Sequence, residues 1–466
     1  MARAVIDGII YAAENGERLS ELLIRVGRAI PMPCGGHGDC GKCRVNVNGQ
    51  AVLACEYEIS GDITVVLPQR ETVVSGIPAP AAGTAEGPFA LALDIGTTTL
   101  ALALVSLGTN GIVRAVTRTN PQRAFGADVM NRIGWCMEHG VRDLQFSVLG
   151  AVEEMLAELD APEIQTLYVA GNTTMLHLFF GADPSGMGVA PYTPAFLGMK
   201  KASGESLGLP KIQSIVSLTG AAAFVGADLT AGLNYIGLPP AGKHRLLIDL
   251  GTNAEIVLFS RNGALCTAAA AGPCFEGANI SCGLSASSGA VCAYGDWGYR
   301  TVNDASAKGI CGTGLVDLIA FLLGNGTVDE TGFMECGEFE AAPGVTLTQK
   351  DIRQYQLAKS AVCSAVETLM LKCGVSYNDI DAVYIAGGFS EKINVNNAVK
   401  TGLLPAALKG KCIPAGNSSL LGTVKYICET NDLSVYLDRT RYADLAADPV
   451  FSDLFVENMT FGADEI

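Results

Sequence analysis

Hydrophobic and polar residues alternate in short runs over the first seventy positions of the chain, a pattern that is typical of β-strands. Residues 3–11 alternate around an Asp-Gly pair, which favours a tight turn, so we expect two paired strands there. Residues 17–29 instead place three leucines and a valine at the spacing of one helix face. Further strands are expected at 42–47, 50–54 and 62–67. The pattern predicts a compact unit of short strands and one helix.

The pattern changes at residues 68–88, which are rich in proline, alanine and glycine. This composition is typical of a flexible linker. A flexible chain spans roughly 5 to 6 Å times the square root of its length, so the segments on either side could move relative to each other.

Beyond the linker, two series of β-rich runs share the order strand, acidic residue, glycine, threonine, strand. The first series begins at Phe89 and the second at Arg245, and each predicts an antiparallel meander. Asp94 and Asp249 stand at equivalent points of the two series. This self-similarity predicts a duplicated α/β lobe.

Helical periodicity and buried strands fill the remainder of both lobes. Thr348 is expected to cap the longest helix through its side chain, and one more helix is expected beyond Asp432. Helices are predicted at 127–139, 144–159, 314–323, 347–372 and 394–401, and buried strands at 165–170 and 381–390. We therefore divide the chain into a first unit at 1–70, a linker at 71–88, a first lobe at 89–240 and a second lobe at 241–466.

The charge of the chain argues against nucleic acid as a partner, because the formal net charge is -16 and nonspecific binding requires Lys and Arg. The most apolar stretch, residues 89–107, is interrupted by Asp94 and three threonines, so no membrane span is expected. The N-terminus lacks the apolar core and cleavage site of a signal peptide. Fifteen cysteines, an odd number, then indicate reduced thiols, and we expect a cytoplasmic protein.

Four cysteines near the N-terminus have the spacing of an iron-sulfur site. Cys34, Cys40 and Cys43 lie at C-x5-C-x2-C spacing in a glycine-rich loop, and Cys55 follows. Thiolates hold iron-sulfur clusters, and amides of a glycine-rich loop can hydrogen-bond the cluster sulfurs. Because the spacing is close to that of plant-type ferredoxins, it predicts a 2Fe-2S cluster with these four ligands.

The four cysteines have two other interpretations. A structural zinc site more often has two C-x2-C pairs, and only Cys40 and Cys43 form one here. Four unrelated core cysteines are the remaining alternative. His37 lies between the ligands, but a Rieske centre needs two histidines, so we interpret His37 as a loop residue.

The two Asp-x-Gly-Thr sequences have the composition of phosphate-binding turns. Each ends a strand with a carboxylate, continues with a glycine that allows a tight turn, and adds hydroxyl and amide groups. Facing each other, the turns could clamp a triphosphate, with Asp94 and Asp249 holding Mg²⁺ and its water ligands. Glu255 is a candidate general base, or a carboxylate behind the metal ligands.

A glycine pair at the end of the strand at 381–390 would let a nucleotide approach the backbone, here as an adenosine site. A single Asp-x-Gly-Thr is more often only a strand that ends in a turn, but two copies and this glycine pair favour ATP. No G-x-x-x-x-G-K-[ST] sequence occurs, which excludes a P-loop. The candidate nucleotide-binding residues are Gly96, Thr97, Thr98, Thr99, Gly251, Thr252, Asn253, Gly387, Gly388 and Phe389.

The other cysteines, among them Cys274, Cys282 and Cys292, are predicted to be small core residues. Cys311 precedes two glycines that either border the nucleotide or start a helix, and both interpretations stay open. His177 is predicted to be a core or interface residue.

The chain resembles the reductive activators of corrinoid proteins, on motifs spread over nearly its whole length. These motifs are the cysteine loop, DIGTTT, AGNTTMLHLFFGADPS, DLGTNAEIVL, AGPCFEGANISCG, GICGTGLVDL, LAKSAV, IAGGF and GNSSLLG. The resemblance implies an α/β protein in which a β-grasp 2Fe-2S ferredoxin domain precedes an ATPase of the actin, sugar kinase and Hsp70 superfamily, built from two RNase H-like lobes.

The resemblance also implies an activity. An ATP-hydrolysing enzyme with a 2Fe-2S cluster and Mg²⁺ would transfer one electron to an inactive Co(II) corrinoid on a partner protein of a methyltransferase system. The product is the Co(I) form used in methyl transfer, and an unidentified low-potential donor would resupply the electron. Since no D-x-H-x-x-G cobalamin motif occurs, the corrinoid is expected on the partner.

Three questions stay open at this point. The chain could instead donate electrons to another low-potential metalloprotein, or it could be a nucleotide-regulated, chaperone-like binding module whose cluster is a sensor. The resemblance also implies that the chain could form a homodimer. Larger relatives carry an extra domain, implicated in dimerisation, where this chain has only the linker, so the sequence leaves the oligomeric state open.

Overall fold

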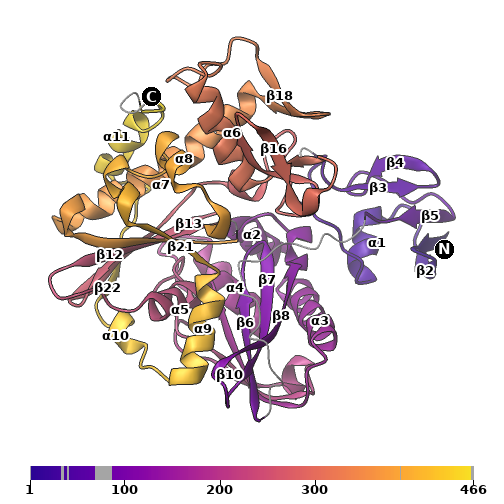
Figure 1. Cartoon of the computed structure of the whole chain (residues 1–466). Helices are drawn as coiled ribbons and strands as arrows, with labels where there is room; N and C mark the ends of the chain where they lie inside the picture. The colour runs from indigo at the N-terminus through magenta and orange to yellow at the C-terminus, as the bar shows by residue number, and fades with distance from the viewer. Residues whose placement is uncertain (1, 33–35, 39–40, 69–86, 389, 463–466) are drawn as a thin grey trace.

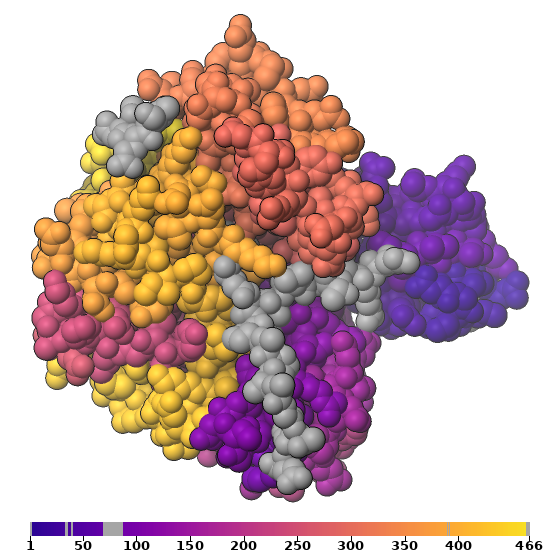
Figure 2. Space-filling model, in the orientation of Figure 1, coloured from indigo at the N-terminus to yellow at the C-terminus, as the bar shows by residue number. Residues whose placement is uncertain are grey.

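The computed structural model describes residues 2–32, 36–38, 41–68, 87–388 and 390–462. A small domain formed by the first described residues projects from the side of a larger, two-lobed body (Figures 1 and 2). The predicted linker at 71–88 lies almost wholly outside the described residues.

The small domain is a five-stranded mixed sheet with one helix, and its strand order is β2-β1-β5-β3-β4. The first two strands pair antiparallel, and β1 pairs with β5 in parallel. Alternating burial in β1 and β5 places one face of the sheet against the helix, because side chains alternate across a strand. The elements are β1 (Ala2–Ile6), β2 (Ile9–Ala13), α1 (Leu19–Arg25), β3 (Arg44–Val47), β4 (Gln50–Leu53) and β5 (Ile63–Val66).

The first lobe is built on a six-stranded sheet with strand order β10-β11-β9-β6-β7-β8. Three strands that follow one another in the sequence, β6, β7 and β8, form the predicted antiparallel meander. On the other side of β6, β9 and then β11 continue the sheet in parallel. The strands are β6 (Phe89–Ile95), β7 (Thr99–Ser106), β8 (Gly111–Thr119), β9 (Ile164–Gly171), β10 (Lys201–Ser203) and β11 (Ile212–Ser217). The helices are η1 (Pro121–Ala124), α2 (Val129–His139), α3 (Arg142–Glu158), α4 (Thr173–Phe180) and α5 (Ala227–Ile236).

The second lobe repeats this topology in a sheet of order β21-β20-β12-β13-β14-β22. Asp94 of β6 pairs with Ala170 of β9, and Asp249 of β12 pairs with Ala386 of β20, so the two aspartates occupy the same place in each sheet. The strands are β12 (His244–Leu250), β13 (Ala254–Ser260), β14 (Gly263–Ala269), β20 (Ile380–Ala386), β21 (Cys412–Gly416) and β22 (Thr440–Tyr442). The prediction of a duplicated α/β lobe is confirmed.

Helices and two small sheets complete the second lobe. The small sheets contain β15 (Ala290–Gly295), β16 (Gly298–Thr301), β17 (Gly309–Ile310), β18 (Glu338–Ala342) and β19 (Val345–Thr348). The helices are η4 (Pro273–Glu276), α6 (Gly312–Gly324), α7 (Gln349–Cys373), α8 (Val395–Lys400), α9 (Ser418–Glu429), α10 (Ser434–Leu437) and α11 (Pro449–Glu457).

Two helices join the lobes because each packs on the sheet of the other lobe. Leu420 and Val424 of α9 pack against alanines of β6 and β7, while α5 packs against β12 and β13 (Figure 1). A Cβ atom at Gly422 would lie 1.7 Å from the carbonyl oxygen of Ala231, so only glycine allows this close crossing of α5 and α9. The predicted division at residue 240 stays a prediction, since α9 follows it in sequence yet covers the first lobe.

Most predicted elements lie within a few residues of their predicted positions. Three α-helices before Asp432 were not predicted, and beyond it two helices, α10 and α11, lie where one was expected. The helix expected from residue 347 begins at Gln349, because Leu347 and Thr348 finish β19. Thr348 caps it as expected, and Asp351 completes a capping box. The unpredicted helices are α4, α5 and α9.

Among the helices of the described residues, none combines the length and the apolar composition that a membrane crossing requires.

Candidate functional site

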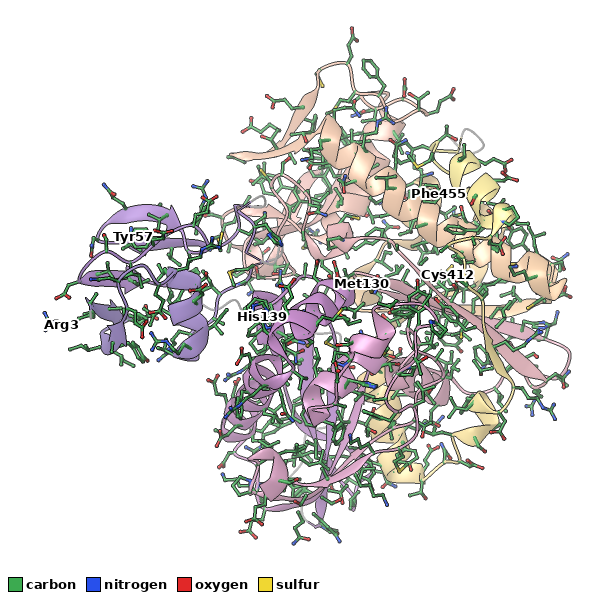
Figure 3. The ribbon with its side chains drawn as sticks, turned by 180° about the vertical axis from the view of Figure 1, so that it is seen from behind. Arg3, Tyr57, Met130, His139, Cys412 and Phe455 are labelled. Carbon is green, nitrogen blue, oxygen red and sulfur yellow. The ribbon has the colours of Figure 1, made fainter. Side chains whose placement is uncertain are left out.

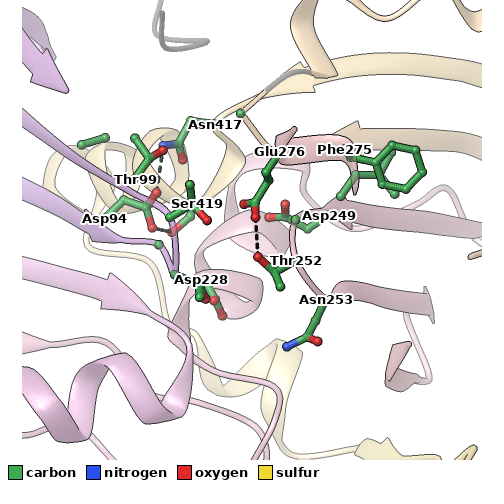
Figure 4. Close-up of a pocket in the computed structure, with 18 of the residues that line it drawn as sticks. Asp94, Thr99, Asp228, Asp249, Thr252, Asn253, Phe275, Glu276, Asn417 and Ser419 are labelled. Atoms are coloured by element: carbon green, nitrogen blue, oxygen red, sulfur yellow. Dashed lines mark hydrogen bonds between the residues drawn. The ribbon is translucent and has the colours of Figure 1, made fainter. Parts of the chain in front are cut away.

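One pocket lies between the two lobes, at the ends of β6 and β12 (Figure 4). Both Asp-x-Gly-Thr turns line it, and Gly387 and Gly388 line it beyond β20. Gly387 has φ 106°, and a Cβ atom there would lie 2.3 Å from the carbonyl oxygen of Leu250. A side chain is therefore excluded at this position, and the backbone stays open to the pocket.

Asp94 is held in place by the beginning of α9. Its two carboxylate oxygens accept hydrogen bonds from the Asn417 side-chain amide at 2.8 Å and from the Ser419 hydroxyl at 2.7 Å. Asn417 also caps α9 by accepting from the backbone N–H of Leu420. The carboxylate of one lobe is thus oriented by a helix that comes from the sequence of the other (Figure 4).

Both turns have a threonine hydroxyl that is bonded to a residue distant in sequence. The Asn172 amide donates to the Thr97 hydroxyl at 3.1 Å, and Asn172 caps α4. In the other turn, the Thr252 hydroxyl donates to the carboxylate of Glu276 on η4. Each contact holds its own turn in place within its lobe.

Five carboxylates line the pocket, and their mutual repulsion and burial shift their proton affinities. Desolvation raises the pKa of Asp249 to about 8, with contributions from the charges of Asp228 and Asp94. Desolvation and the charge of Asp94 raise the pKa of Asp228 to about 7. Burial, followed by the charges of Asp228 and Asp249, raises the pKa of Glu255 well above its usual range. The arrangement is unfavourable when all of these groups are ionised.

These oxygens fit a divalent cation. Mg²⁺ prefers carboxylate and water oxygens, and a cation would offset the repulsion that raises these pKa values. Asp94, Asp228 and Asp249 are on three different elements that meet here (Figure 4). Among the described residues, Asp94 accepts hydrogen bonds from neutral donors only, so no cationic side chain there neutralises its charge.

We expect the chain without nucleotide to lose stability as pH rises from 6.5 to 8.5. The folded chain holds protons on Asp228 and Asp249 that the unfolded chain has released above about pH 4. The stability from each such group is present below its unfolded pKa and is lost as pH rises through its folded pKa. The decrease is about 1.4 kcal/mol per pH unit for each proton held only in the folded state.

Urea unfolding at three pH values across this range measures the effect. Mg²⁺ should reduce the slope, and Asp249→Asn should reduce it without the cation. A free energy of unfolding that is constant or rises with pH would contradict the carboxylate assignment.

A second candidate site lies in the small domain, where the β3–β4 hairpin brings two cysteines together. Cys43 precedes β3, Cys55 follows β4, and both side chains are buried. Their Sγ atoms are 3.3 Å apart, which is too long for a disulfide and close enough for two ligands of one metal site. Gly36 of the cysteine loop lies beside Cys55, since a Cβ atom on it would lie 3.9 Å from the Cβ of Cys55. This sulfur pair fits an iron-sulfur cluster.

Family models match successive parts of the chain. A 2Fe-2S iron-sulfur cluster binding domain matches residues 5–64, the RACo middle region matches residues 89–240, and the C-terminal domain of RACo, the ASKHA domain, matches residues 243–466. RamQ, a corrinoid activation enzyme of Eubacterium limosum, is 31% identical over 427 residues, covering 80% of this chain and 70% of the relative. The chain belongs to the family of reductive activators of corrinoid proteins.

Two further relatives agree with this membership. A reductase of a methylated amine-specific corrinoid protein, in its Co(II) form, from Methanosarcina barkeri is 25% identical and covers 74% of this chain and 71% of its own length. The solved structure of a reductive activator for corrinoid, iron-sulfur protein superposes with a TM-score of 0.74 and 26% identity, covering 99% of this chain and 98% of that one. The predicted fold, a ferredoxin-type domain followed by an actin-like ATPase, is confirmed.

The structure of this family member brings most of the predicted site residues together, although their roles stay predictions. Phe389, Cys34 and Cys40 lie outside the described residues. The predicted site residues that line the pocket are Asp94, Gly96, Thr97, Thr98, Thr99, Asp249, Gly251, Thr252, Asn253, Glu255, Gly387 and Gly388.

Sequence reasoning missed other polar residues of this pocket. Asn172 and Asn417 each follow a strand and a glycine, in the similar sequences GNTT and GNSS. This repeated strand-Gly-Asn-helix signal could have indicated them. Asp228, Glu276 and Ser419 also line the pocket. The sequence around Asp228 and Glu276 contains no comparable signal.

His177 and Cys274 are core residues as predicted, whereas Cys282 and Cys292 are only partly buried, so the prediction of a core position is wrong for those two. The His177 ring is buried, stacks on Phe196, and accepts a hydrogen bond from the backbone N–H of Ala195 at 2.9 Å. His37 is an exposed loop residue. Burial raises the pKa of Cys274, so its thiol stays protonated in the core. Cys311 is buried, and Gly312 begins α6, which confirms the interpretation as a helix start. Gly312 also lines the pocket, so the interpretation as a nucleotide border stays a prediction.

Proposed function

We propose that the chain is an ATP-hydrolysing reductive activator, which passes one electron from a 2Fe-2S cluster to the Co(II) corrinoid of a partner protein and so regenerates Co(I) for methyl transfer. The observation that carries the proposal is that a single chain contains both the pocket between the lobes and the cysteine site of the small domain. Two phosphate-binding turns face each other across a pocket of carboxylates, and a buried cysteine pair lies in a ferredoxin-type domain on the same body.

The need for ATP follows from the energy of the electron transfer. A potential gap of about 59 mV corresponds to a factor of ten for one electron, or about 1.4 kcal/mol. An uphill transfer of a few hundred millivolts therefore requires on the order of 5 to 10 kcal/mol. A ferredoxin alone cannot supply this, whereas a domain that hydrolyses ATP can.

In the pocket, the chain's residues bind the triphosphate and its metal. We propose that the backbone amides of Thr97, Thr98 and Thr252 would contact phosphate oxygens. Asp94 and Asp249 would hold Mg²⁺ with water ligands, and Mg²⁺ would neutralise phosphate charge. Lobe closure around the nucleotide would orient the terminal phosphate.

Glu255 is the proposed general base. Burial and neighbouring carboxylates raise its pKa, and a bound Mg²⁺ would lower it, so that the ionised group could accept a proton from an attacking water. It lies on β13 in register with Asp249, so the base and the metal-holding carboxylate are on adjacent strands.

In the small domain, Cys43 and Cys55 would hold the cluster together with Cys34 and Cys40, and the cluster supplies one-electron transfer. Because Cys43 and Cys55 are buried, water is kept from their sulfur atoms. We propose that the linker at 71–88 lets this domain approach the corrinoid of the partner.

The direct test is corrinoid reduction with and without nucleotide. The chain, purified without oxygen and chemically reduced, is mixed with a methyltransferase corrinoid protein poised as Co(II), and the Co(I) absorption is followed. We expect Co(I) to accumulate with ATP and not in its absence. A non-hydrolysable ATP analogue separates binding from hydrolysis.

Equal reduction without nucleotide would defeat the coupled activity. Reduction of another low-potential metalloprotein but not of any corrinoid protein would favour the alternative electron donor. Nucleotide-dependent partner binding without any electron transfer would favour the binding module.

A further inference from the structure

The carbonyl groups of the first phosphate turn all accept hydrogen bonds from one segment of the chain. The side-chain amide of Asn120 donates to the Gly96 carbonyl at 2.8 Å, and its backbone N–H donates to the Thr98 carbonyl at 2.8 Å. The Arg132 guanidinium donates to the Thr97 carbonyl at 2.6 Å. We call residues 120–132 the connector. It joins the end of β8 to the first turn of α2 through η1.

This arrangement determines what the turn presents to the pocket. Because three successive carbonyls are bonded to the connector, they are unavailable to repel a phosphate. Within the described residues, the backbone N–H groups of Thr97 and Thr98 have no hydrogen-bond partner, and both residues line the pocket. Unpaired amides beside a cavity form an anion-binding surface.

Arg132 adds a buried positive charge beneath the turn. Its side chain is fully buried, and it also donates to the Gly126 carbonyl at 3.1 Å, the Gln122 side-chain oxygen at 3.5 Å and the Met175 sulfur at 3.0 Å. In the part of the chain that the structure describes, no carboxylate forms an ion pair with it. Burial lowers its pKa only to about 9, so it remains charged at neutral pH. A buried charge held by neutral groups is costly, which a bound phosphate would offset.

The same connector also holds the small domain. The backbone N–H of Met32 donates to the Arg123 carbonyl on η1 at 3.1 Å, and Ile24 and Ala29 pack against the core of the first lobe. Met32 stands between two prolines, which have no N–H, and two positions before the predicted ligand Cys34. The only backbone donor of this triplet is therefore bonded to the connector.

We propose that Asn120 and Arg132 are positioning residues for the phosphate turn, and that the connector links nucleotide binding at this turn to the contact that holds the iron-sulfur domain. The inference rests on the proposed function, because it assumes that the pocket binds ATP. A bound phosphate changes the position of the turn through its amides. The connector must follow, because it is bonded to three neighbouring carbonyls. Its other side holds Met32, so the two sites share one element whose position each can bias.

The chain contains a built-in reporter of the connector. It has two tryptophans, and the ring of Trp135 on α2 lies 5.1 Å from Phe125 of the connector and 4.1 Å from His139. In Figure 3, His139 lies on the side of the lobe nearest the small domain. Trp297 is 59% exposed on the other lobe. A Trp297→Phe chain therefore has Trp135 as its only tryptophan.

The experiment uses the full chain with its cluster in the Trp297→Phe background. Calorimetry gives the affinity for Mg²⁺-ADP and for a non-hydrolysable ATP analogue. Trp135 emission and the visible circular dichroism of the cluster are recorded with and without saturating nucleotide. We expect both spectra to change on binding in the parent chain.

Two variants test the connector. Asn120→Asp keeps the oxygen that caps η1 but removes the donor to Gly96, and Arg132→Met removes the charge with little change in length. We expect each to weaken nucleotide binding by roughly 10- to 100-fold, as for loss of a hydrogen bond to a charged or buried group. At saturating nucleotide, we expect both spectral changes to be lost. Arg132→Lys should restore part of the affinity.

The matched control is Arg118→Met, because Arg118 on β8 pairs only with surface carboxylates of α3. It should change neither affinity nor spectra. Thermal unfolding checks that each variant is folded, and Asn120→Asp, which is isosteric, serves if Arg132→Met does not fold.

Two results would overturn the inference: parent spectra that do not respond to nucleotide, or connector variants that respond as the parent does. Neither depends on corrinoid reduction. A chain that reduces the corrinoid only with ATP but shows no spectral response contradicts the inference alone. A chain that responds to nucleotide but never reduces a corrinoid contradicts the proposed activity alone.

Discussion

Asp249→Asn should abolish ATP hydrolysis and at the same time stabilise the chain that has no nucleotide. Hydrolysis should fall by about 10³-fold or more, because the variant loses a carboxylate that would hold Mg²⁺ at the phosphates. The nucleotide-free chain should gain on the order of 2 kcal/mol at pH 8, because the substitution removes a buried charge whose pKa is raised to about 8 by its surroundings. Phosphate release and urea unfolding measure the two effects.

Lower hydrolysis together with higher stability distinguishes a metal-holding carboxylate from a residue that only supports the fold. Loss of a structural residue would instead lower both the hydrolysis rate and the free energy of unfolding. Asp453→Asn is the matched control, because Asp453 is exposed on α11. The visible spectrum of the cluster should be the same in both variants. Hydrolysis at the rate of the unmodified chain in Asp249→Asn would place the metal elsewhere.

Cys43→Ser should remove the 2Fe-2S spectrum and corrinoid reduction while hydrolysis of ATP continues. The Cys43 sulfur lies 3.3 Å from that of Cys55, and serine lacks the soft thiolate that holds iron. We expect the electron-transfer rate to fall by at least about 10³-fold, as for loss of a cofactor that carries the chemistry. Iron content, visible absorption and phosphate release are measured on the same preparation.

Cys363→Ser is the matched control for a buried cysteine. Its thiol lies in α7, and burial raises its pKa to about 12, so it is a protonated core residue. This variant should keep the cluster and the electron transfer. A normal spectrum in Cys43→Ser would show that the cluster has other ligands. Loss of the spectrum in Cys363→Ser as well would mean that the cluster depends on general stability.

Local patterns predicted the elements of this protein well where one strand or helix carries its own signal. The alternating runs of β1 to β5 and the two meanders need only neighbouring residues, because side-chain direction has a period of two in a strand. Thr348 was predicted as a cap for the same reason, since capping involves residues three positions apart. The helices α5 and α9 lack such a signal, because their first turns contain small or polar residues and much of their burial comes from the opposite lobe. The helix α4 is buried on every side in the core of its own lobe, so its sequence shows no polar face.

In the candidate site, too, some residues could be predicted from the sequence and others could not. Asp94 and Asp249 were visible because each ends a strand before a glycine and a threonine, and duplication made the signal stronger. Asp228 and Glu276 reach the same pocket from α5 and η4, and their neighbours in sequence do not indicate this. Only the packing of α5 between the lobes brings the first of them there.

The sequence by itself therefore determined that the chain has a cysteine-rich ferredoxin-type unit, two Asp-x-Gly-Thr turns at the ends of equivalent strands, and a family membership. These properties depend on spacing along the chain, which composition and order carry directly. The tertiary structure decided which groups act on those turns: Asn417 and Ser419 on Asp94, and Asn120 and Arg132 on the carbonyls behind it. Such contacts join residues far apart in the chain, and they exist only after α5 and α9 cross between the lobes and the small domain rests against η1.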